Sequence, residues 1–156
     1  MADAEQKNLF QLQRLYLKDL SFEAPNAPEV FKKDWKPEVK LEVNNTATPI
    51  EEGIYEVVLK VIASAKVEDK TAFIVEIQQA GLFAVKGLEG VHLQHVLKGV
   101  CANILFPYAR EAVSDVVSKG TFPQLMLQPI NFEAAFAEQM RRQQEEAKAK
   151  EGDTTH

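Results

Sequence analysis

The feature that most constrains the fold is a change in the spacing of apolar residues near residue 90. Between residues 38 and 79, apolar and polar residues alternate, which is typical of strands. After residue 90, apolar residues recur with the spacing of a helix. A chain whose strands precede its helices is predicted to form an α+β domain with an antiparallel sheet.

Three segments show the strand pattern. Residues 38–43 alternate cleanly and predict a half-buried strand. Residues 54–66 and 71–79 continue the pattern on either side of a polar break at 68–70, which predicts an antiparallel hairpin. Residues 44–49, which contain two asparagines and end at a proline, predict a turn between the first two strands.

The N-terminal part is less clear. Residues 8–22 fit helical spacing about as well as strand spacing, so periodicity leaves this segment open. Residues 23–37 contain three prolines, which exclude a long helix or a central strand. This stretch is predicted to be a crossover loop that holds two large apolar side chains, Phe31 and Trp35.

Glycines break the strand pattern before the helical part begins. Gly81, Gly87 and Gly90 are predicted to interrupt the chain after the last strand. Residues 91–100 then predict one short helix, and Asn103 is suited to cap a second helix that ends at Gly120.

A last helix is predicted to begin after Asn131, which can cap it. One side of this helix has large apolar residues at i, i+4 and i+8, namely Phe132, Phe136 and Met140. The sequence beyond Arg141 is polar and charged. We therefore expect a single domain over residues 1–142, and over 143–156 a polar tail, at most a solvated helical extension that becomes disordered.

Composition excludes several functional classes. The net charge of -5 and the pI near 5.3 argue against a nucleic-acid-binding protein, which needs a basic surface. The single cysteine, Cys101, rules out an intramolecular disulfide and fits a reducing compartment. Residues 1–8 lack the basic and apolar runs of a signal peptide, and no apolar run is long enough to span a bilayer. These features predict a cytoplasmic protein without membrane insertion.

Motifs for catalysis or cofactor binding are also missing. The lysines and glycines fit neither the phosphate-loop pattern nor the dinucleotide-binding pattern. Cys101 would need a base such as His92 or His95 to act as a nucleophile, and burial in the core is the simpler interpretation. The two histidines alone make a weak zinc site. No cofactor, no metal and no enzymatic activity are predicted.

The positive signal is a set of large apolar side chains in unusual places. Phe31 and Trp35 lie in a proline-rich loop, and Phe132, Phe136 and Met140 lie on a terminal helix whose other side is polar. One interpretation is that both groups pack on the domain's own sheet. The other is that they border an accessible groove or an oligomer interface, because large apolar patches on proteins in water mark binding surfaces.

Several short strings then resemble, in order, the SecB family of protein-export chaperones over roughly residues 9–140. They are Lys18-Asp19, Ser21-Phe22-Glu23-Ala24-Pro25-Asn26-Ala27-Pro28, Asp34-Trp35, Pro37-Glu38-Val39, Tyr55-Glu56-Val57-Val58-Leu59, Asn103-Ile104-Leu105-Phe106-Pro107-Tyr108-Ala109-Arg110-Glu111, Gly120-Thr121-Phe122-Pro123-Gln124-Leu125 and Pro129-Ile130-Asn131-Phe132. One departure is Ala80, where the family more often has glycine, so the local turn is in doubt.

The resemblance implies a four-stranded antiparallel sheet with flanking helices, in which the first segment is a strand. It also implies a homotetramer built as a dimer of dimers. The helix after Asn103 would lie at the subunit interfaces, and strand residues would face it. The interface residues implied are Val75, Ile77, Gln79, Leu105, Ala109, Ala112 and Val116.

The resemblance further implies an ATP-independent holdase that binds unfolded precursor proteins and delivers them to the SecA motor of the Sec translocase. The client-binding groove would contain Phe31, Trp35, Phe132, Phe136 and Met140. SecA's basic, zinc-containing tail would meet an acidic sheet face formed by Asp19, Glu23, Ile74 and Glu76. Solvated strand charges remain the alternative for this face. An adaptor that only self-assembles, or a small α+β enzyme, remain alternatives for the chain.

Overall fold

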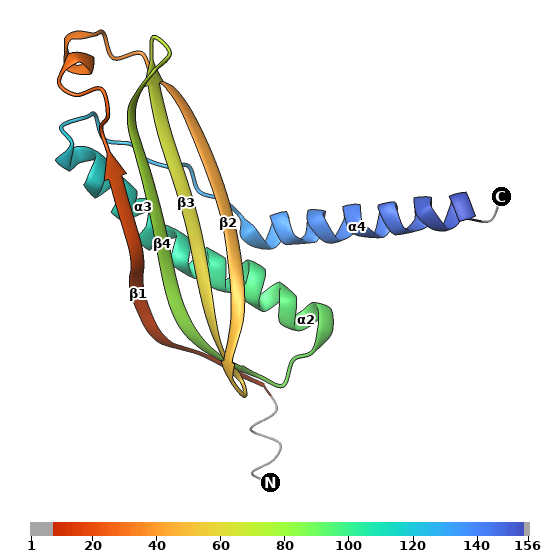
Figure 1. Ribbon diagram of the computed structural model, residues 1–156. Coiled ribbons are helices and arrows are strands. Elements are labelled where there is room, and N and C mark those ends of the chain that lie inside the picture. Colours follow the sequence, from red (N-terminus) through yellow and green to blue (C-terminus); the bar gives the residue numbers. More distant parts are fainter. Residues whose placement is uncertain (1–7, 155–156) are drawn as a thin grey trace.

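The computed structural model describes residues 8–154 and shows one antiparallel sheet with helices on one of its faces (Figure 1). The strand order is β1-β4-β3-β2, so β1 and β2 are the two edges. The long helix α3 crosses behind the sheet, and the last helix, α4, extends away from the body (Figure 1). The α+β class and the four-stranded antiparallel sheet are therefore confirmed.

The four strands are long and continuous in the chain. They are β1 (Leu9–Glu23), β2 (Glu38–Glu51), β3 (Ile54–Val67) and β4 (Lys70–Lys86). The first segment, which periodicity left open, is the strand that the family resemblance implied. The proline-rich loop after it contains one short 3-10 helix, η1 (Glu29–Lys32).

The turn predicted at residues 44–49 is wrong, because β2 runs through this stretch to Glu51. Asn45 pairs with Leu59 of β3, and its side-chain amide donates to the carbonyl oxygen of Lys98 at 2.9 Å. A partner from a distant helix therefore satisfies a side chain that would otherwise favour a turn. The chain reverses instead at Gly53, whose φ of 75° suits glycine.

The predicted hairpin between the next two strands is present. Glu68 and Asp69 occupy its two central positions with φ values of 52° and 64°. A turn with positive φ at both central residues matches the twist of the flanking strands. Residues 70–86 then form the longest strand of the sheet.

The predicted break at Gly81 is also wrong, because Gly81 lies inside β4. Its neighbour Ala80 pairs with Tyr16 on one side and Val58 on the other, so no turn exists there. A Cβ atom on Gly81 would stand 2.8 Å from a ring carbon of Phe83 and 3.2 Å from the carbonyl oxygen of Arg14. The glycine thus serves a close approach between β1 and β4 rather than a turn.

The two helices predicted after residue 90 form one continuous stretch. It consists of α2 (Gly90–His95), the π-helical segment η2 (Val96–Val100) and α3 (Cys101–Lys119). Asn103 consequently does not cap α3. Its Oδ1 accepts a hydrogen bond from the backbone N–H of Phe132 at 2.9 Å, at the start of α4. The predicted end at Gly120 is confirmed.

Helix α4 spans Phe132–Thr154. Asn131 caps it as predicted, since its Oδ1 accepts from the N–H of Ala134 at 3.1 Å. The polar tail is helical from residue 143 up to Thr154 and exposed through Gly152, whereas residues 155–156, like 1–7, lie outside the described part of the chain. Within residues 8–154, none of the helices combines the length and the apolar character that a membrane span requires.

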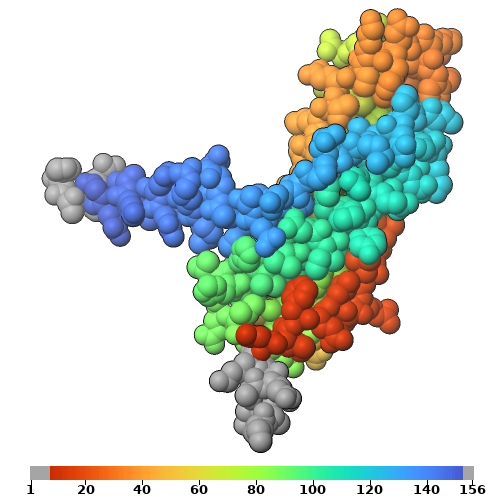
Figure 2. All heavy atoms as spheres, turned by 180° about the vertical axis from the view of Figure 1, so that it is seen from behind, coloured from red at the N-terminus to blue at the C-terminus, as the bar shows by residue number. Residues whose placement is uncertain are grey.

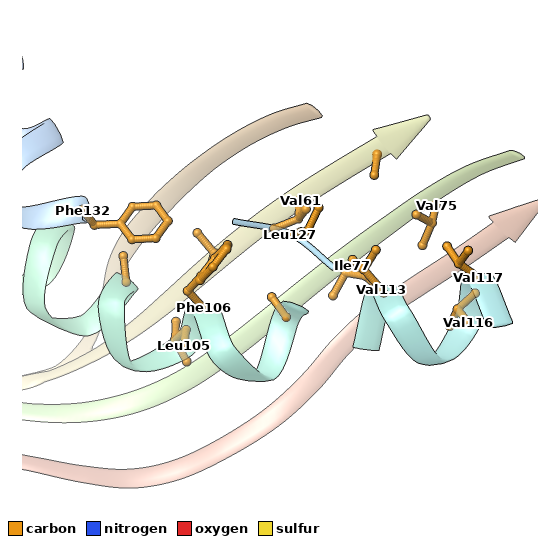
Figure 3. Close-up of a cluster of buried hydrophobic side chains, with 14 of the residues drawn as sticks. Val61, Val75, Ile77, Leu105, Phe106, Val113, Val116, Val117, Leu127 and Phe132 are labelled. Carbon is orange, nitrogen blue, oxygen red and sulfur yellow. The ribbon is translucent and has the colours of Figure 1, made fainter. Parts of the chain in front are cut away.

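The core lies between α3 and the face of the sheet that α3 covers, which we call the inner face; the opposite face is the outer face. Figure 3 shows Val75 and Ile77 on β4 and Val61 on β3 pointing towards this helix. Leu105 and Val113 of α3 meet them and are completely buried. This packing fixes which strand residues face inwards and which face outwards.

Candidate functional site

The inner face of the sheet is unevenly covered. Helix α3 lies across β4 and β3, whereas β2 lies at the edge beyond it. Val39 and Leu41 of β2 pair with the buried inner-face residues Ala65 and Ala63 of β3, yet remain 46% and 39% exposed. The result is an apolar strip along the inner side of β2.

A cleft of about 850 Å³ adjoins the end of this strip, between β2, the α2–η2 stretch and α4. Val43, Asn44 and Asn45 of β2 form one wall. Residues of α4 border the other side, among them the predicted Phe132, Phe136 and Met140. The cleft is therefore mainly apolar with amide groups on its rim, a composition suited to extended polypeptide rather than to a small charged ligand.

Phe31 and Trp35 lie elsewhere, in an aromatic cluster at the opposite end of the sheet. The Phe31 ring is 5.3 Å from that of Phe122, and the Trp35 ring is 5.6 Å from the same phenylalanine. Phe73 stacks on Trp35 at 6.4 Å. Phe31 is 49% exposed, so the cluster presents an apolar surface to solvent.

The five predicted client residues thus divide between two places. Phe132, Phe136 and Met140 border the cleft, and Phe31 and Trp35 belong to the aromatic cluster. Phe132 and Phe136 are largely buried by the chain itself, as the core-packing alternative predicted. Residues 121–131 run between α3 and the loop–β2 region, from the aromatic cluster towards the cleft (Figure 2).

Sequence reasoning missed the residues that β2 and the η2 segment contribute to the cleft. Asn45 and Lys98 are the main examples, and they bind one another through two hydrogen bonds. A signal was present, because Asn45 continues the inward parity of Val39, Leu41 and Val43. A polar residue at an inward position of a strand indicates a specific buried partner.

On the outer face, the structure brings together the four residues predicted to bind SecA. Glu23 pairs with Ile74, and Ser21, which lies between Glu23 and Asp19, pairs with Glu76. All four side chains therefore project from adjacent strands on the face opposite α3. Ile74 is 37% exposed, so this patch offers one apolar side chain among carboxylates.

Ion pairs modify the charge of this face. Lys60 Nζ lies 3.0 Å from a carboxylate oxygen of Glu76. Lys18 Nζ lies 2.8 Å from Glu56, whose other oxygen accepts a hydrogen bond from the Tyr16 hydroxyl. The bond from Lys18, with that from Tyr16, lowers the pKa of Glu56, whereas burial, together with the nearby carboxylate, raises the pKa of Tyr16 to about 12.

The residues predicted for the oligomer interface lie mostly inside the chain. Val75 and Ile77 face Leu105 and Ala109 across the core, and all four are buried. Gln79 is buried as well, and its amide donates to the Tyr16 carbonyl oxygen at 3.1 Å. Val116 is nearly buried and Ala112 is half-buried, so Ala112 is the most accessible of the predicted set.

Two of the residues considered for catalysis, Cys101 and His95, are engaged in the packing or hydrogen bonding of the fold. Cys101 is buried, and burial raises the pKa of its thiol to about 12, which leaves almost no thiolate at neutral pH. His95 Nε2 lies 3.0 Å from a carboxylate oxygen of Glu133. Among residues 8–154, no three His, Cys, Asp or Glu side chains gather as metal ligands would.

Solved structures with a similar fold include a chaperone. A SecB-like chaperone of Mycobacterium tuberculosis, solved with a peptide from an antitoxin, matches with a TM-score of 0.65 at 18% identity, covering 83% of this chain and 95% of that one. A protein of unknown function from Streptococcus agalactiae matches with a TM-score of 0.43 at 12% identity, covering 78% and 98%. The first match shows the fold, and the second is too distant to support an argument.

The family model for SecB, the preprotein translocase subunit, matches residues 3–143, which is most of the 156-residue chain. This match is independent of the fold comparison and covers the sheet, the helices and the start of the polar tail. SecB is a family of chaperones rather than of enzymes. The resemblance seen in the short sequence strings is confirmed, and the chain belongs to the SecB family.

Proposed function

We propose that this chain is an ATP-independent, cytoplasmic holdase that binds unfolded precursor proteins, keeps them competent for translocation and delivers them to the SecA motor. The observation that supports this most directly is the apolar surface on the inner face, from the Phe31 cluster along Val39 and Leu41 to the cleft at Phe136. An unfolded chain exposes apolar side chains and backbone that a folded protein hides. An exposed apolar surface can bind these groups without any chemical reaction.

Weak individual contacts suit this task. Burial of apolar surface contributes about 25 cal/mol per Å², so one anchored side chain holds a client only briefly. Several grooves acting on one long chain raise the avidity by orders of magnitude, while each contact can still open for handover. Binding the unfolded state also shifts the folding equilibrium of the client away from its native state.

Client contacts are proposed at both ends of the inner face. Phe136 and Met140, with Phe132, would anchor apolar side chains in the cleft, whereas Phe31 and Trp35 would do so at the aromatic cluster. The accessible edge of each group supports this assignment, since Met140 is half-buried and Phe31 is exposed. Packing in the chain's own core remains the alternative for Phe132 and Phe136.

Delivery to SecA is proposed to use the outer face. Glu23 pairs with Ile74, Glu76 follows two residues along β4, and Asp19 pairs with Gln78 two residues further. This row of carboxylates along adjacent strands would attract a cationic tail. Any zinc would belong to that tail. The attraction between exposed charges should weaken as salt concentration rises.

A homotetramer, arranged as a dimer of dimers, is proposed as the assembled state. The unpaired edge strand β1 supports it, because several of its large apolar side chains are exposed. They are Leu9, Phe10, Leu12, Leu17 and Leu20. The same observation favours a second candidate function, an adaptor whose apolar surface serves self-assembly alone.

Light scattering of a diluted unfolded precursor separates the two candidates. A holdase suppresses the rise in scattering at stoichiometric amounts without nucleotide, and an adaptor does not. Phe136→Ala and Trp35→Ala should weaken suppression while the mass, measured in parallel, stays that of the assembly. Ile50→Ala is the matched control, since Ile50 is exposed at the end of β2 and is not a lining residue of the cleft. Full scattering with the unmodified chain would contradict the proposal.

A further inference from the structure

The two walls of the cleft meet at the π-helical segment η2, Val96–Val100. Lys98 of this segment is a lining residue of the cleft, and α4 packs on the segment as it leaves the body. A π-helical turn inside a longer helix is rare and often found at functional sites. Here its residues contact both β2 and α4, which are distant in the sequence.

The contact with β2 is reciprocal. The amide of Asn45 donates to the carbonyl oxygen of Lys98 at 2.9 Å, and Lys98 Nζ donates to the carbonyl oxygen of Asn45 at 3.2 Å. A side chain that bonds a helix carbonyl is a recognised cause of departure from the regular helical ladder. These two bonds fix the distance between the edge strand and the helix at the cleft.

The contact with α4 is equally close. A Cβ atom on Gly99 would stand 3.0 Å from Cγ and 3.1 Å from Cα of Glu133, so the first turn of α4 rests directly on the backbone of η2. The Glu133 carboxylate is held at both oxygens, by His95 Nε2 at 3.0 Å and by Asn103 Nδ2 at 3.2 Å. Since a carboxylate only accepts, His95 donates through Nε2.

Asn103 completes the junction. Its Oδ1 accepts from the N–H of Phe132 at 2.9 Å while its amide nitrogen reaches Glu133. The start of α4 is thus capped by a side chain from another helix, in addition to its own cap, Asn131. From Arg141 to Gly152 the helix is exposed on all sides, so its direction is set by the turns before this stretch, which begin at the junction.

We propose that Asn45, Lys98, Asn103 and Glu133 are positioning residues that hold β2 and α4 at a fixed spacing, and thereby set the width of the cleft. The inference rests on the proposed function, because it explains how a groove made by an edge strand and a projecting helix stays open before a client arrives. A width fixed by polar bonds would admit one extended chain with large apolar side chains. Without these bonds α4 would pivot on Phe132 and the wall would become variable.

Deletion of these bonds should disturb α4 more than the core. Spin labels on Asn44→Cys and Gln143→Cys lie on opposite walls of the cleft. Doubly labelled chains, diluted with unlabelled ones, report the distance within one chain, because the buried Cys101 does not react. We expect a narrow distribution for the parent, and a broader or shifted one for Glu133→Ala and for Asn45→Ala.

Client capture should change in parallel. Affinity for an unfolded precursor should fall about three- to tenfold in both variants, the size expected when one hydrogen bond no longer holds the bound arrangement. Glu133→Gln keeps an acceptor for Asn103 and can donate to the other tautomer of His95, so it should restore both readouts. Gln139→Ala, which alters the lining of the cleft but not this junction, should leave the distance unchanged.

Two results would overturn the inference. One is an unchanged distance distribution with unchanged capture in both variants. The other is weaker capture with an unchanged distribution, which would mean that Glu133 and Asn45 touch the client directly. If the parent captures no client, the proposed function fails, yet the distance measurement still decides whether the junction positions α4. Asn45→Ala, on the opposite wall, keeps the test valid if Glu133→Ala does not fold.

Discussion

The two faces of the sheet hold their side chains in opposite ways. On the inner face Val61, Val75 and Ile77 are sealed beneath α3, and the cleft begins only where that cover ends at β2. On the outer face the strands place ion pairs such as Lys60–Glu76 in contact with water. Apolar packing therefore holds the side chains of the inner face, whereas ion pairs hold those of the outer face. The same kind of substitution should consequently have different effects on the two faces.

The largest difference should appear in thiol reactivity. Burial raises the pKa of Cys101 to about 12, so at pH 8 its thiolate fraction is about a thousandfold below that of an ordinary thiol. A second cysteine introduced by Thr46→Cys on the exposed outer side of β2 should react with Ellman's reagent at the ordinary rate. If the two cysteines reacted at rates within tenfold of one another, Cys101 would have to be accessible to the reagent, contrary to its burial in the core.

Two adjacent residues of β4 give the next test, on stability. Phe73 is 1% exposed on the inner face, so Phe73→Ala should lower the free energy of unfolding by about 3–5 kcal/mol. Ile74 points outwards, and Ile74→Ala should cost less than about 1 kcal/mol, because little buried volume is lost. Urea denaturation at one fixed protein concentration measures both. Equal losses would remove the distinction between the faces.

A pH titration tests the part of the outer face near Tyr16. Because its folded pKa is raised to about 12 from an unfolded value near 10, Tyr16 stabilises the fold below pH 10 and loses this contribution as pH rises towards 12. The lowered pKa of Glu56 acts in the other direction, so its contribution is present at neutral pH and lost in acid.

Absorbance at 295 nm, compared between the parent and Tyr16→Phe, isolates this phenol. The difference curve should show little ionisation at pH 10.5, and Glu56→Gln should shift it to lower pH, since the nearby carboxylate is one cause of the raised value. A midpoint near 10 in the parent would mean that neither burial nor Glu56 perturbs the Tyr16 phenol in solution.

The strand pattern and the resemblance predicted the fold, but three local signals were misread. A turn was predicted around Asn45 and a break in the chain at Gly81. Asn103 was predicted to cap the helix in which it lies. Their partners are distant, since Lys98 lies 53 residues from Asn45 and Phe132 lies 29 from Asn103. The missing Cβ of Gly81 accommodates the backbone of Arg14 on β1. A signal that depends on a distant partner cannot be interpreted from its neighbours in sequence.

The candidate site was predictable to the extent that it depends on local periodicity. Spacing alone placed Phe132, Phe136 and Met140 on one side of a helix. The β2 wall of the cleft was only partly predictable. The inward position of Asn45 indicated a buried partner, but periodicity does not show which strand forms an edge. Likewise, alternation placed Asp19 with Glu23 and Ile74 with Glu76, but the pairing of β1 with β4 is a property of the strand order.

The smallest expected effect concerns Lys60, which already occupies one side of Glu76 at 3.0 Å. Both side chains are about one-third exposed, so Lys60→Met should change the free energy of unfolding by at most about 0.5 kcal/mol. Yet it frees a carboxylate for a cationic partner, and the proposed binding of SecA should strengthen by about threefold at low salt. Lys66→Met removes an exposed charge from the end of the same strand and serves as the control. An equal gain in both variants would show that net charge, rather than the Lys60–Glu76 pair, governs the outer face, because long-range attraction does not distinguish the two positions.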